Sequence, residues 1–146
     1  MKIAIGTDHR GIDIKNKIIE HFKGEYDFID KSTNAFEGDD YPDYAFKVAE
    51  AVKNKEADFG VLMCGTGIGM SIAANKVKGI RCALVHSKEE AKLARIHNDA
   101  NIISFGSYND IEDIYEFIKT FIETNDNQEE RHIRRVNKIK EYENRS

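Results

Sequence analysis

The chain has 146 residues, of which 40% are hydrophobic and 33% are charged, and this is the composition of a folded globular protein. We therefore expect one domain over residues 1–146 that buries a full core. The net charge of −4 argues against nucleic-acid binding, which usually leaves a basic surface, and no apolar run is long enough to cross a membrane. The only cysteines, Cys64 and Cys82, suggest no disulfide framework and favour a reducing cytoplasm.

Five short apolar runs predict strands, and segments with helical periodicity separate them. The runs are Lys2–Gly6, Tyr26–Asp30, Phe59–Cys64, Arg81–Val85 and Asn101–Phe105. Because the first run begins almost at residue 1, we expect no signal peptide before the fold. Strands that alternate with helices predict a doubly wound, Rossmann-like α/β fold, in which a five-stranded parallel sheet carries helices on both faces.

Several helices are predicted from apolar stripes and from end signals. Pro42 predicts the start of the helix after the second strand, and Ser87 with Glu90 predicts a capping box. The stripes comprise Ile14, Ile18, Ile19 and Phe22; Ala45, Val48, Ala49 and Val52; Ile111, Ile114, Ile118 and Phe121; and Ile133, Val136 and Ile139. The last stripe predicts a C-terminal helix from Asp126 to Ser146.

A glycine-rich turn follows the third predicted strand and is the most informative stretch of the chain. It reads Cys64-Gly65-Thr66-Gly67-Ile68-Gly69 and leads into an alanine-rich segment that suits a helix. Such a turn directs backbone N–H groups at one place near a positive helix end, where an anion can sit. The same environment favours the thiolate of a cysteine, and a base beside an anion site suits proton transfer through an enolate-like intermediate.

Other interpretations of this turn stay open. Glycine turns often only reverse the chain, and a cysteine that ends a buried strand often acts as a small hydrophobic residue. Nucleotide binding also uses glycine turns, but here the spacing differs from the dinucleotide fingerprint, and no GxxxxGK[ST] phosphate loop is present. Neither a CxxC pair nor an HExxH motif occurs, so the sequence predicts no metal and no cofactor.

Polar residues follow several of the predicted elements. Ligands of parallel sheets bind beyond the carboxyl ends of the strands, so we expect Asp8, Cys64 and His97 to converge on that rim. Taken singly, Asp8 could be only a helix cap, and His97 only a residue favoured at a helix C-terminus. Arg131 and Arg135, four residues apart, share a helix face and could hold one phosphate, although a solvated charged face explains them as well.

Six sequence blocks, taken together and in order, resemble ribose-5-phosphate isomerases of the B type, a family that also contains the galactose-6-phosphate isomerase subunits. The blocks are Gly6-Thr7-Asp8-His9-Arg10-Gly11, Asp40-Tyr41-Pro42, Cys64-Gly65-Thr66-Gly67-Ile68-Gly69, Ala73-Ala74-Asn75-Lys76, His97-Asn98-Asp99 and Arg131-His132-Ile133-Arg134-Arg135. The resemblance runs from the first strand to the last helix. It implies a metal-independent and cofactor-free interconversion of D-ribose 5-phosphate and D-ribulose 5-phosphate, in the non-oxidative branch of the pentose phosphate pathway.

The resemblance also implies a role for each site residue. Cys64 would move a proton between C1 and C2, since Met70 stands where some members carry a glutamate base. The remaining roles are ring opening by His97 and Asp8 beside Thr66; support of the enediolate oxygen by the amides of Gly65, Gly67, Ile68 and Gly69, with help from the Ser71 region; phosphate binding by His9, Arg131 and Arg135; and sugar contacts by Tyr41 and Asn98.

The family pattern further implies a homodimer, alone or paired into a dimer of dimers, in which His97 enters the pocket of the partner chain. One departure concerns Tyr108, which stands where several members carry a phosphate-binding arginine. Two other functions stay open: the same chemistry on a six-carbon sugar phosphate such as galactose 6-phosphate or allose 6-phosphate, and a non-catalytic regulator that binds phosphate or nucleotide.

Overall fold

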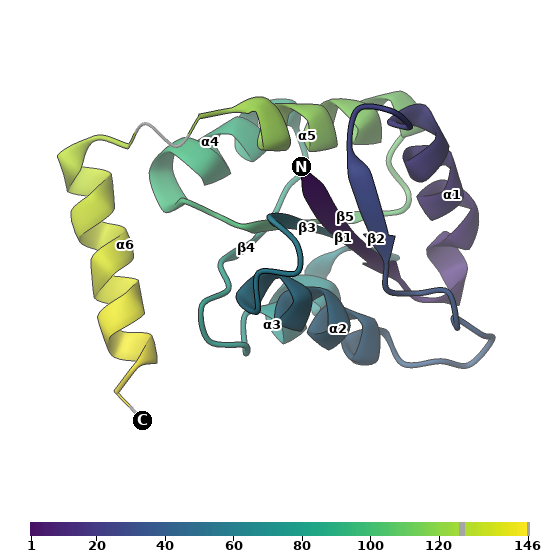
Figure 1. Ribbon diagram of the computed structural model, residues 1–146, viewed down its shortest axis with the longest axis horizontal. Helices are drawn as coiled ribbons and strands as arrows, with labels where there is room; N and C mark the ends of the chain where they lie inside the picture. The colour runs from purple at the N-terminus through teal and green to yellow at the C-terminus, as the bar shows by residue number, and fades with distance from the viewer. Residues whose placement is uncertain (126–127, 146) are drawn as a thin grey trace.

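The computed structural model describes residues 1–125 and 128–145 (Figure 1). In this part of the chain, one parallel sheet contains five strands: β1 (Lys2–Thr7), β2 (Asp27–Asp30), β3 (Phe59–Cys64), β4 (Cys82–Leu84) and β5 (Ile102–Gly106). Their order in the sheet is β2-β1-β3-β5-β4. All the predicted strands are confirmed, with β2 and β4 slightly shorter than expected. The doubly wound α/β architecture is therefore confirmed as well.

Helices cover both faces of the sheet. The helical elements are η1 (His9–Gly11), α1 (Ile12–His21), α2 (Tyr41–Lys53), α3 (Ile68–Ala74), α4 (Lys88–Asn98), α5 (Ile111–Glu123) and α6 (Glu130–Glu143). Figure 1 shows α1, α4 and α5 on one side of the sheet and α2 and α3 on the other. The predicted ends of the C-terminal helix, Asp126 and Ser146, lie outside the described residues. None of the described helices is long and apolar enough to cross a membrane.

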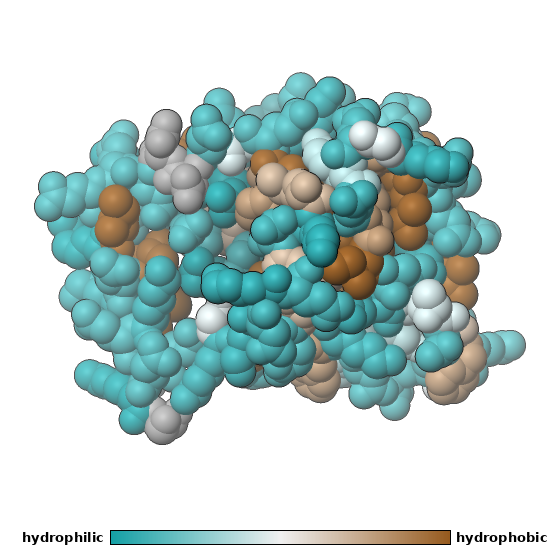
Figure 2. Space-filling view, in the orientation of Figure 1, coloured by the Kyte–Doolittle hydropathy of each residue, from teal (hydrophilic) through white to brown (hydrophobic). Residues whose placement is uncertain are grey.

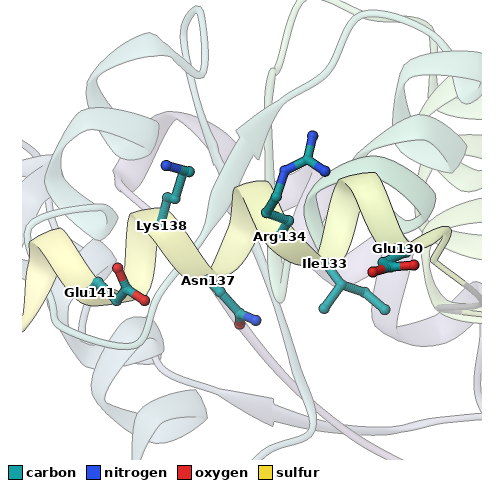
Figure 3. A pocket seen from close by; sticks show the side chains of 6 residues that line it. All are labelled: Glu130, Ile133, Arg134, Asn137, Lys138 and Glu141. Carbon is teal, nitrogen blue, oxygen red and sulfur yellow. The ribbon is translucent and has the colours of Figure 1, made fainter.

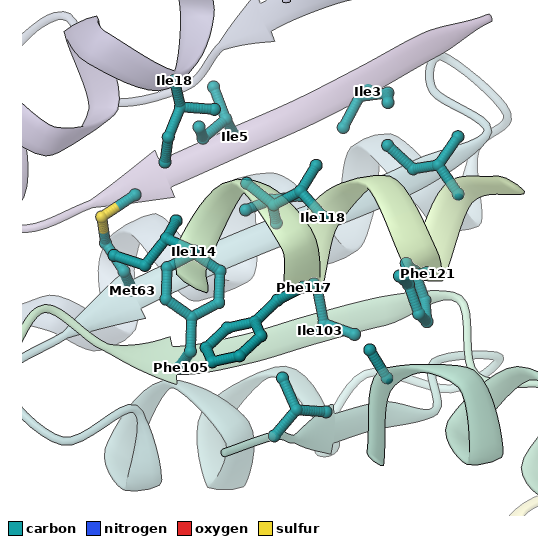
Figure 4. Packing of buried hydrophobic residues seen from close by; sticks show 14 of the residues in the cluster. Ile3, Ile5, Ile18, Met63, Ile103, Phe105, Ile114, Phe117, Ile118 and Phe121 are labelled. Atoms are coloured by element: carbon teal, nitrogen blue, oxygen red, sulfur yellow. The ribbon is translucent and has the colours of Figure 1, made fainter. Parts of the chain in front are cut away.

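Two apolar clusters form the core, one on each face of the sheet. Because side chains alternate along a strand, Ile3 and Ile5 of β1 face α1 and α5, whereas Ala4 between them faces α2. Figure 4 shows the first cluster, in which Phe117 and Phe121 of α5 pack over the sheet. Burial on both faces explains why the strands read as nearly continuous apolar runs.

The predicted helix starts of α2 and α4 agree with the structure. Pro42 lies in the first turn of α2, where its missing N–H costs no helical hydrogen bond. The Ser87 hydroxyl accepts the Glu90 N–H at 3.1 Å and caps α4. The Glu90 carboxylate, however, accepts the His86 N–H at 2.6 Å, so the second bond of the cap involves the residue before Ser87.

Helix α6 stands apart from the layered body and packs mainly against α4 (Figure 1). His132 and Val136 form its buried side, and most other α6 side chains are exposed. Ile133 and Ile139 keep 45% and 51% of their surface exposed, which leaves apolar surface on α6 uncovered. In the view of Figure 2 the surface is mostly hydrophilic, with apolar residues exposed in separate places that include α6.

Candidate active site

A cleft lies at the carboxyl ends of the neighbouring strands β1 and β3. The chain goes from β1 to β2 on one side of this pair and from β3 to β4 on the other side, and ligands of open α/β sheets bind at such a switch point. The cleft has a volume of about 460 Å³ and is lined by Asp8, Arg10, Tyr41, Cys64, Gly65, Thr66, Ile68, Gly69 and Ile72. Most of the residues predicted from the first strand end and the glycine turn thus lie together.

Cys64 ends β3 and forms part of the floor of the cleft. It is 7% exposed, and its Sγ accepts the Gly67 N–H at 3.2 Å. Gly67 has a φ of 81°, and a Cβ at this position would lie 2.6 Å from the Phe105 backbone, so only glycine fits. The Ser104 hydroxyl donates to the Gly67 carbonyl at 2.6 Å. The loop around Cys64 is therefore held in place by β5.

Thr66 belongs to the same loop as Cys64, and Tyr41 approaches this loop from the start of α2. The Thr66 hydroxyl accepts the Ile68 N–H at 3.2 Å and lies at the exposed side of the turn. A Cβ at Gly69 would lie 2.5 Å from the Tyr41 ring, so the missing side chain lets the phenol approach the backbone. Tyr41 is 39% exposed and begins α2, which positions its ring over the cleft.

Asp8 and His9 follow β1 and have different surroundings. Asp8 accepts the Arg10 N–H at 3.1 Å, so it does cap a helical turn, as its simpler interpretation predicted, and it also lines the cleft. His9 Nδ1 lies 2.7 Å from an oxygen of Asp39, a residue that the sequence interpretation did not include. The bond to Nδ1 leaves Nε2 available for a ligand.

Asp39 holds His9 in place as a charged partner. Burial opposes its ionisation, but hydrogen bonds from His9, from the Tyr44 hydroxyl and from backbone N–H groups outweigh burial and lower the pKa of Asp39 to about 2. Ligand atoms of Asp8, His9 and Asp39 all lie within 4.8 Å of one another, a grouping that could hold a metal ion. The hydrogen bonds that Asp8 and Asp39 accept explain why these atoms lie together. That the reaction needs no metal stays a prediction.

His97 and Asn98 lie at the opposite edge of the sheet from Cys64 within one chain. A crossover helix runs against its strands, so the C-terminal end of α4 reaches the amino edge. Consistent with this, Asn101 follows α4 closely and accepts the Gly60 N–H at the start of β3, at 3.0 Å. The expectation that His97 converges with Asp8 and Cys64 on one rim is therefore wrong for a single chain.

Five residues at this edge form what we name the α4–α6 cluster: His97, Asn98, Arg131, His132 and Arg135. The His97 and His132 rings stack, with centroids 4.3 Å apart and planes inclined by 23°. The pKa of His132 is lowered by its burial and by the positive charge of the neighbouring His97 and Arg131. Arg131 and Arg135 are exposed on α6, and Arg131 pairs with Glu129.

Tyr108, Cys82 and Ser71 lie outside the cleft lining. Tyr108 is 65% exposed, and its ring covers Gly106 at the end of β5. Cys82 is buried in β4, and burial raises its pKa to about 12, as suits an inert packing residue. The Ser71 hydroxyl bonds to this thiol.

Arg10 and Ile72 line the cleft although no role was predicted for them. Arg10 lies inside a block carrying the resemblance, so its position was a usable signal.

A shallow depression of about 400 Å³ runs along the outer side of α6 (Figure 3). Its lining comes from this one helix: Glu130, Ile133, Arg134, Asn137, Lys138 and Glu141. None of these side chains reaches the cleft, so the depression is an open helix surface. Ile68 and Ile72 at the cleft are also exposed, by 51% and 57%. The chain thus leaves apolar surface uncovered in both places.

Comparisons with known proteins agree on one family. The profile of the family described as Ribose/Galactose Isomerase matches residues 3–139. Ribose-5-phosphate isomerase B of Escherichia coli (strain K12) is 49% identical over 73% of this chain and 72% of its own length. The structure of the Clostridium thermocellum enzyme of the same name is 45% identical, covers 98% of this chain and 97% of its own and has a TM-score of 0.93. A Mycoplasma genitalium structure with bound ribulose-5-phosphate is 41% identical, covers 99% and 97%, and has a TM-score of 0.91.

Proposed function

The chain belongs to the ribose/galactose isomerase family, and from this membership we propose that it interconverts D-ribose 5-phosphate and D-ribulose 5-phosphate. The observation that carries the proposal is the position of Cys64, which lies beside the glycine loop in a cleft at the carboxyl end of β3. The reaction would take place in the cytoplasm, within the non-oxidative branch of the pentose phosphate pathway.

In the proposed reaction Cys64 is the base. Its thiolate takes the proton from C2 of the open-chain aldose, the electron pair of that bond forms the C1–C2 double bond, and the C1 oxygen becomes the enediolate oxygen. The proton of the 2-hydroxyl then passes to the C1 oxygen as the C2 carbonyl forms, and the thiol returns its proton to C1 to give the ketose. The N–H of Gly67 points at Sγ, and such a contact is strongest when the sulfur carries negative charge. The backbone amides of Gly65 and Gly69 would hold the enediolate oxygen in a site that needs no metal. The amides of Gly67 and Ile68 would join them by exchanging their bonds to Cys64 Sγ and to the Thr66 hydroxyl for bonds to the substrate.

A second chain would complete the pocket. His97 lies far from Cys64 in its own chain, yet ring opening needs an acid and a base at the same sugar, a role we assign to His97 and Asp8. The partner's α4–α6 cluster would bring His97 next to the cleft, so the proposed assembly is a homodimer with its sites at the interface, alone or as a dimer of dimers. The exposed Ile68, Ile72 and Ile133 support this arrangement, because apolar surface of this kind suits a partner.

The other contacts follow from this arrangement. His9, fixed by Asp39, would bind the phosphate with Nε2, and Arg131 and Arg135 of the partner would bind it from the other side. Thr66 lies where it could assist ring opening, and Tyr41 and Asn98 would contact the sugar hydroxyls. A phosphate bound in this way supplies binding energy remote from the reacting carbons.

An assay of aldose–ketose interconversion across phosphorylated pentoses and hexoses tests the proposal. We expect the highest kcat/KM for ribose 5-phosphate, with no loss of activity in EDTA. A preference for galactose 6-phosphate or allose 6-phosphate would keep the chemistry but change the substrate. No isomerisation of any sugar phosphate, together with ordinary reactivity of the Cys64 thiol across a pH series, would instead support a non-catalytic regulator.

A further inference from the structure

Arg10 lines the cleft, but none of the substrate contacts proposed above involves its side chain. Its backbone N–H is held by the Asp8 carboxylate at 3.1 Å, which fixes where its side chain leaves the η1 turn. The side chain reaches the glycine loop, since a Cβ at Gly65 would lie 4.0 Å from Nη1 of Arg10. The Arg10 guanidinium therefore lies beside the loop that also carries Cys64.

The charges of the cleft leave this guanidinium available. Among the described residues that line the cleft, Arg10 is the only cationic side chain and Asp8 the only carboxylate. The structure shows no ion pair or hydrogen bond of the Arg10 side chain within residues 1–125 and 128–145, and the residue is exposed. An unpaired, planar guanidinium at the mouth of a cleft suits a phosphate group, which it can bind through two N–H donors.

The other side of the same loop carries no charge. The Tyr108 ring covers Gly106, and a Cβ on Gly106 would lie 3.0 Å from the Gly65 carbonyl, so Tyr108 and Arg10 flank Gly65. Tyr108 offers one hydroxyl, which can make one neutral hydrogen bond. Of the two side chains that flank Gly65, only Arg10 can therefore make a charge–charge contact with an anion.

We propose that Arg10 binds the phosphate group of the sugar in the cleft of its own chain and thereby favours phosphorylated over unphosphorylated sugars. The assignment rests on the proposed function, because phosphate is the only charged group of that substrate. It divides the phosphate contacts between two chains: Arg10 and His9 from the chain that supplies Cys64, and the α6 arginines from its partner.

The first experiment measures anion binding without any reaction. The melting temperature is followed along a series of inorganic phosphate concentrations, with ionic strength held constant by chloride. The phosphate concentration that gives half of the maximal shift should be at least about tenfold higher for Arg10→Ala than for wild type. The concentration for Arg10→Lys should lie between these two values. The control is Lys17→Ala, which removes one exposed positive charge from α1 outside the cleft and should match wild type.

The second experiment uses the reaction itself. Arg10→Ala should raise KM for ribose 5-phosphate about tenfold or more with little change in kcat, and Tyr108→Arg added to it should recover part of that loss. With unphosphorylated ribose, wild type and Arg10→Ala should not differ, because that sugar carries no phosphate for the guanidinium to bind. An unchanged phosphate response in Arg10→Ala, or no response in wild type, overturns the assignment. A phosphate response that depends on Arg10 in a protein without isomerase activity would overturn the proposed function alone.

Discussion

The cleft and the α4–α6 cluster are built in opposite ways. The cleft lies at the ends of the two central strands, and its loop is held by hydrogen bonds to β5 and by a glycine at a φ of 81°. The cluster joins the end of α4 to α6, a helix that packs mainly against α4 and exposes most of its side chains. The cleft contains the proposed base, whereas the cluster contains groups that, in the proposed homodimer, serve the pocket of the second chain. Under that proposal, assembly is a condition for chemistry.

Loss of the base should have the largest effect. Cys64→Ala should lower kcat by more than about a hundredfold, because a base acts on the transition state, while binding of the sugar phosphate persists. Steady-state kinetics and calorimetric binding of ribose 5-phosphate measure the two quantities. The matched control is Cys82→Ala, which removes the buried thiol of β4 and should keep kcat. A kcat near that of wild type in Cys64→Ala would show that the cleft does not hold the base.

Subunit mixing tests whether the two regions serve one pocket. Cys64→Ala and His97→Ala should each be nearly inactive, but after exchange of subunits the mixture should recover about a quarter of the wild-type activity. Random pairing makes about half of the dimers mixed, and each mixed dimer has one intact pocket of two.

The control for this mixing is Cys64→Ala combined with the double variant Cys64→Ala/His97→Ala, a mixture that contains no intact pocket and should stay inactive. If the first mixture also stays inactive although mass spectrometry shows exchange, His97 and Cys64 do not complete each other across an interface. The cleft and the α4–α6 cluster would then not form one shared pocket.

The α6 arginines should have a smaller effect, confined to binding. Arg131→Ala and Arg135→Ala should each raise KM for the phosphorylated sugar about ten- to a hundredfold, because charge-assisted hydrogen bonds contribute roughly 1.5–3 kcal/mol. Lys140→Ala is the control, since helical periodicity places Lys140 across the buried stripe of α6 from the two arginines. Unchanged KM values in both arginine variants would make α6 a scaffold only.

The smallest expected effect concerns the attachment of α6. The lowered pKa of His132 means that docked α6 favours the neutral imidazole, so the contribution of docking to stability is full above pH 6.5 and decreases as the pH falls below that value. His97, Arg131 and Arg135 add positive charge nearby, and Glu129 opposes them. The rate at which trypsin cleaves α6, divided by its rate on an unfolded control peptide, should therefore be higher at pH 5.5 than at pH 7.5.

The His132→Phe variant separates this effect from the pH dependence of the protease. It keeps an aromatic ring against His97 but cannot be protonated, so the ratio of wild-type to variant cleavage rates should rise as the pH falls. A constant ratio across the series would mean that His132 does not control the attachment of α6.

Most of the fold and half of the site could be predicted because they are local in sequence. Short, nearly continuous apolar runs located the strands, and the glycine turn placed Cys64 at a carboxyl end. Asp39 could not be found in this way, since it meets His9 across 30 positions of the chain. The position of His97 was misjudged because the rim rule was applied to a helix C-terminus, which returns to the amino edge. Arg10 lies inside the first block of the resemblance, but no role was predicted for it because the resemblance implies roles only for its neighbours Asp8 and His9.

The central position of β1 and β3 also has a consequence for hydrogen exchange. Both strands have neighbours on each side and buried faces, and the carbonyl of Cys64 accepts the Ser107 N–H at 2.8 Å. Amides of this kind exchange with solvent only when the whole domain unfolds, whereas those of α6 can exchange through local opening. The floor of the cleft thus belongs to the most stable cooperative unit of the chain, and the protein should lose α6 long before it loses the geometry around its base.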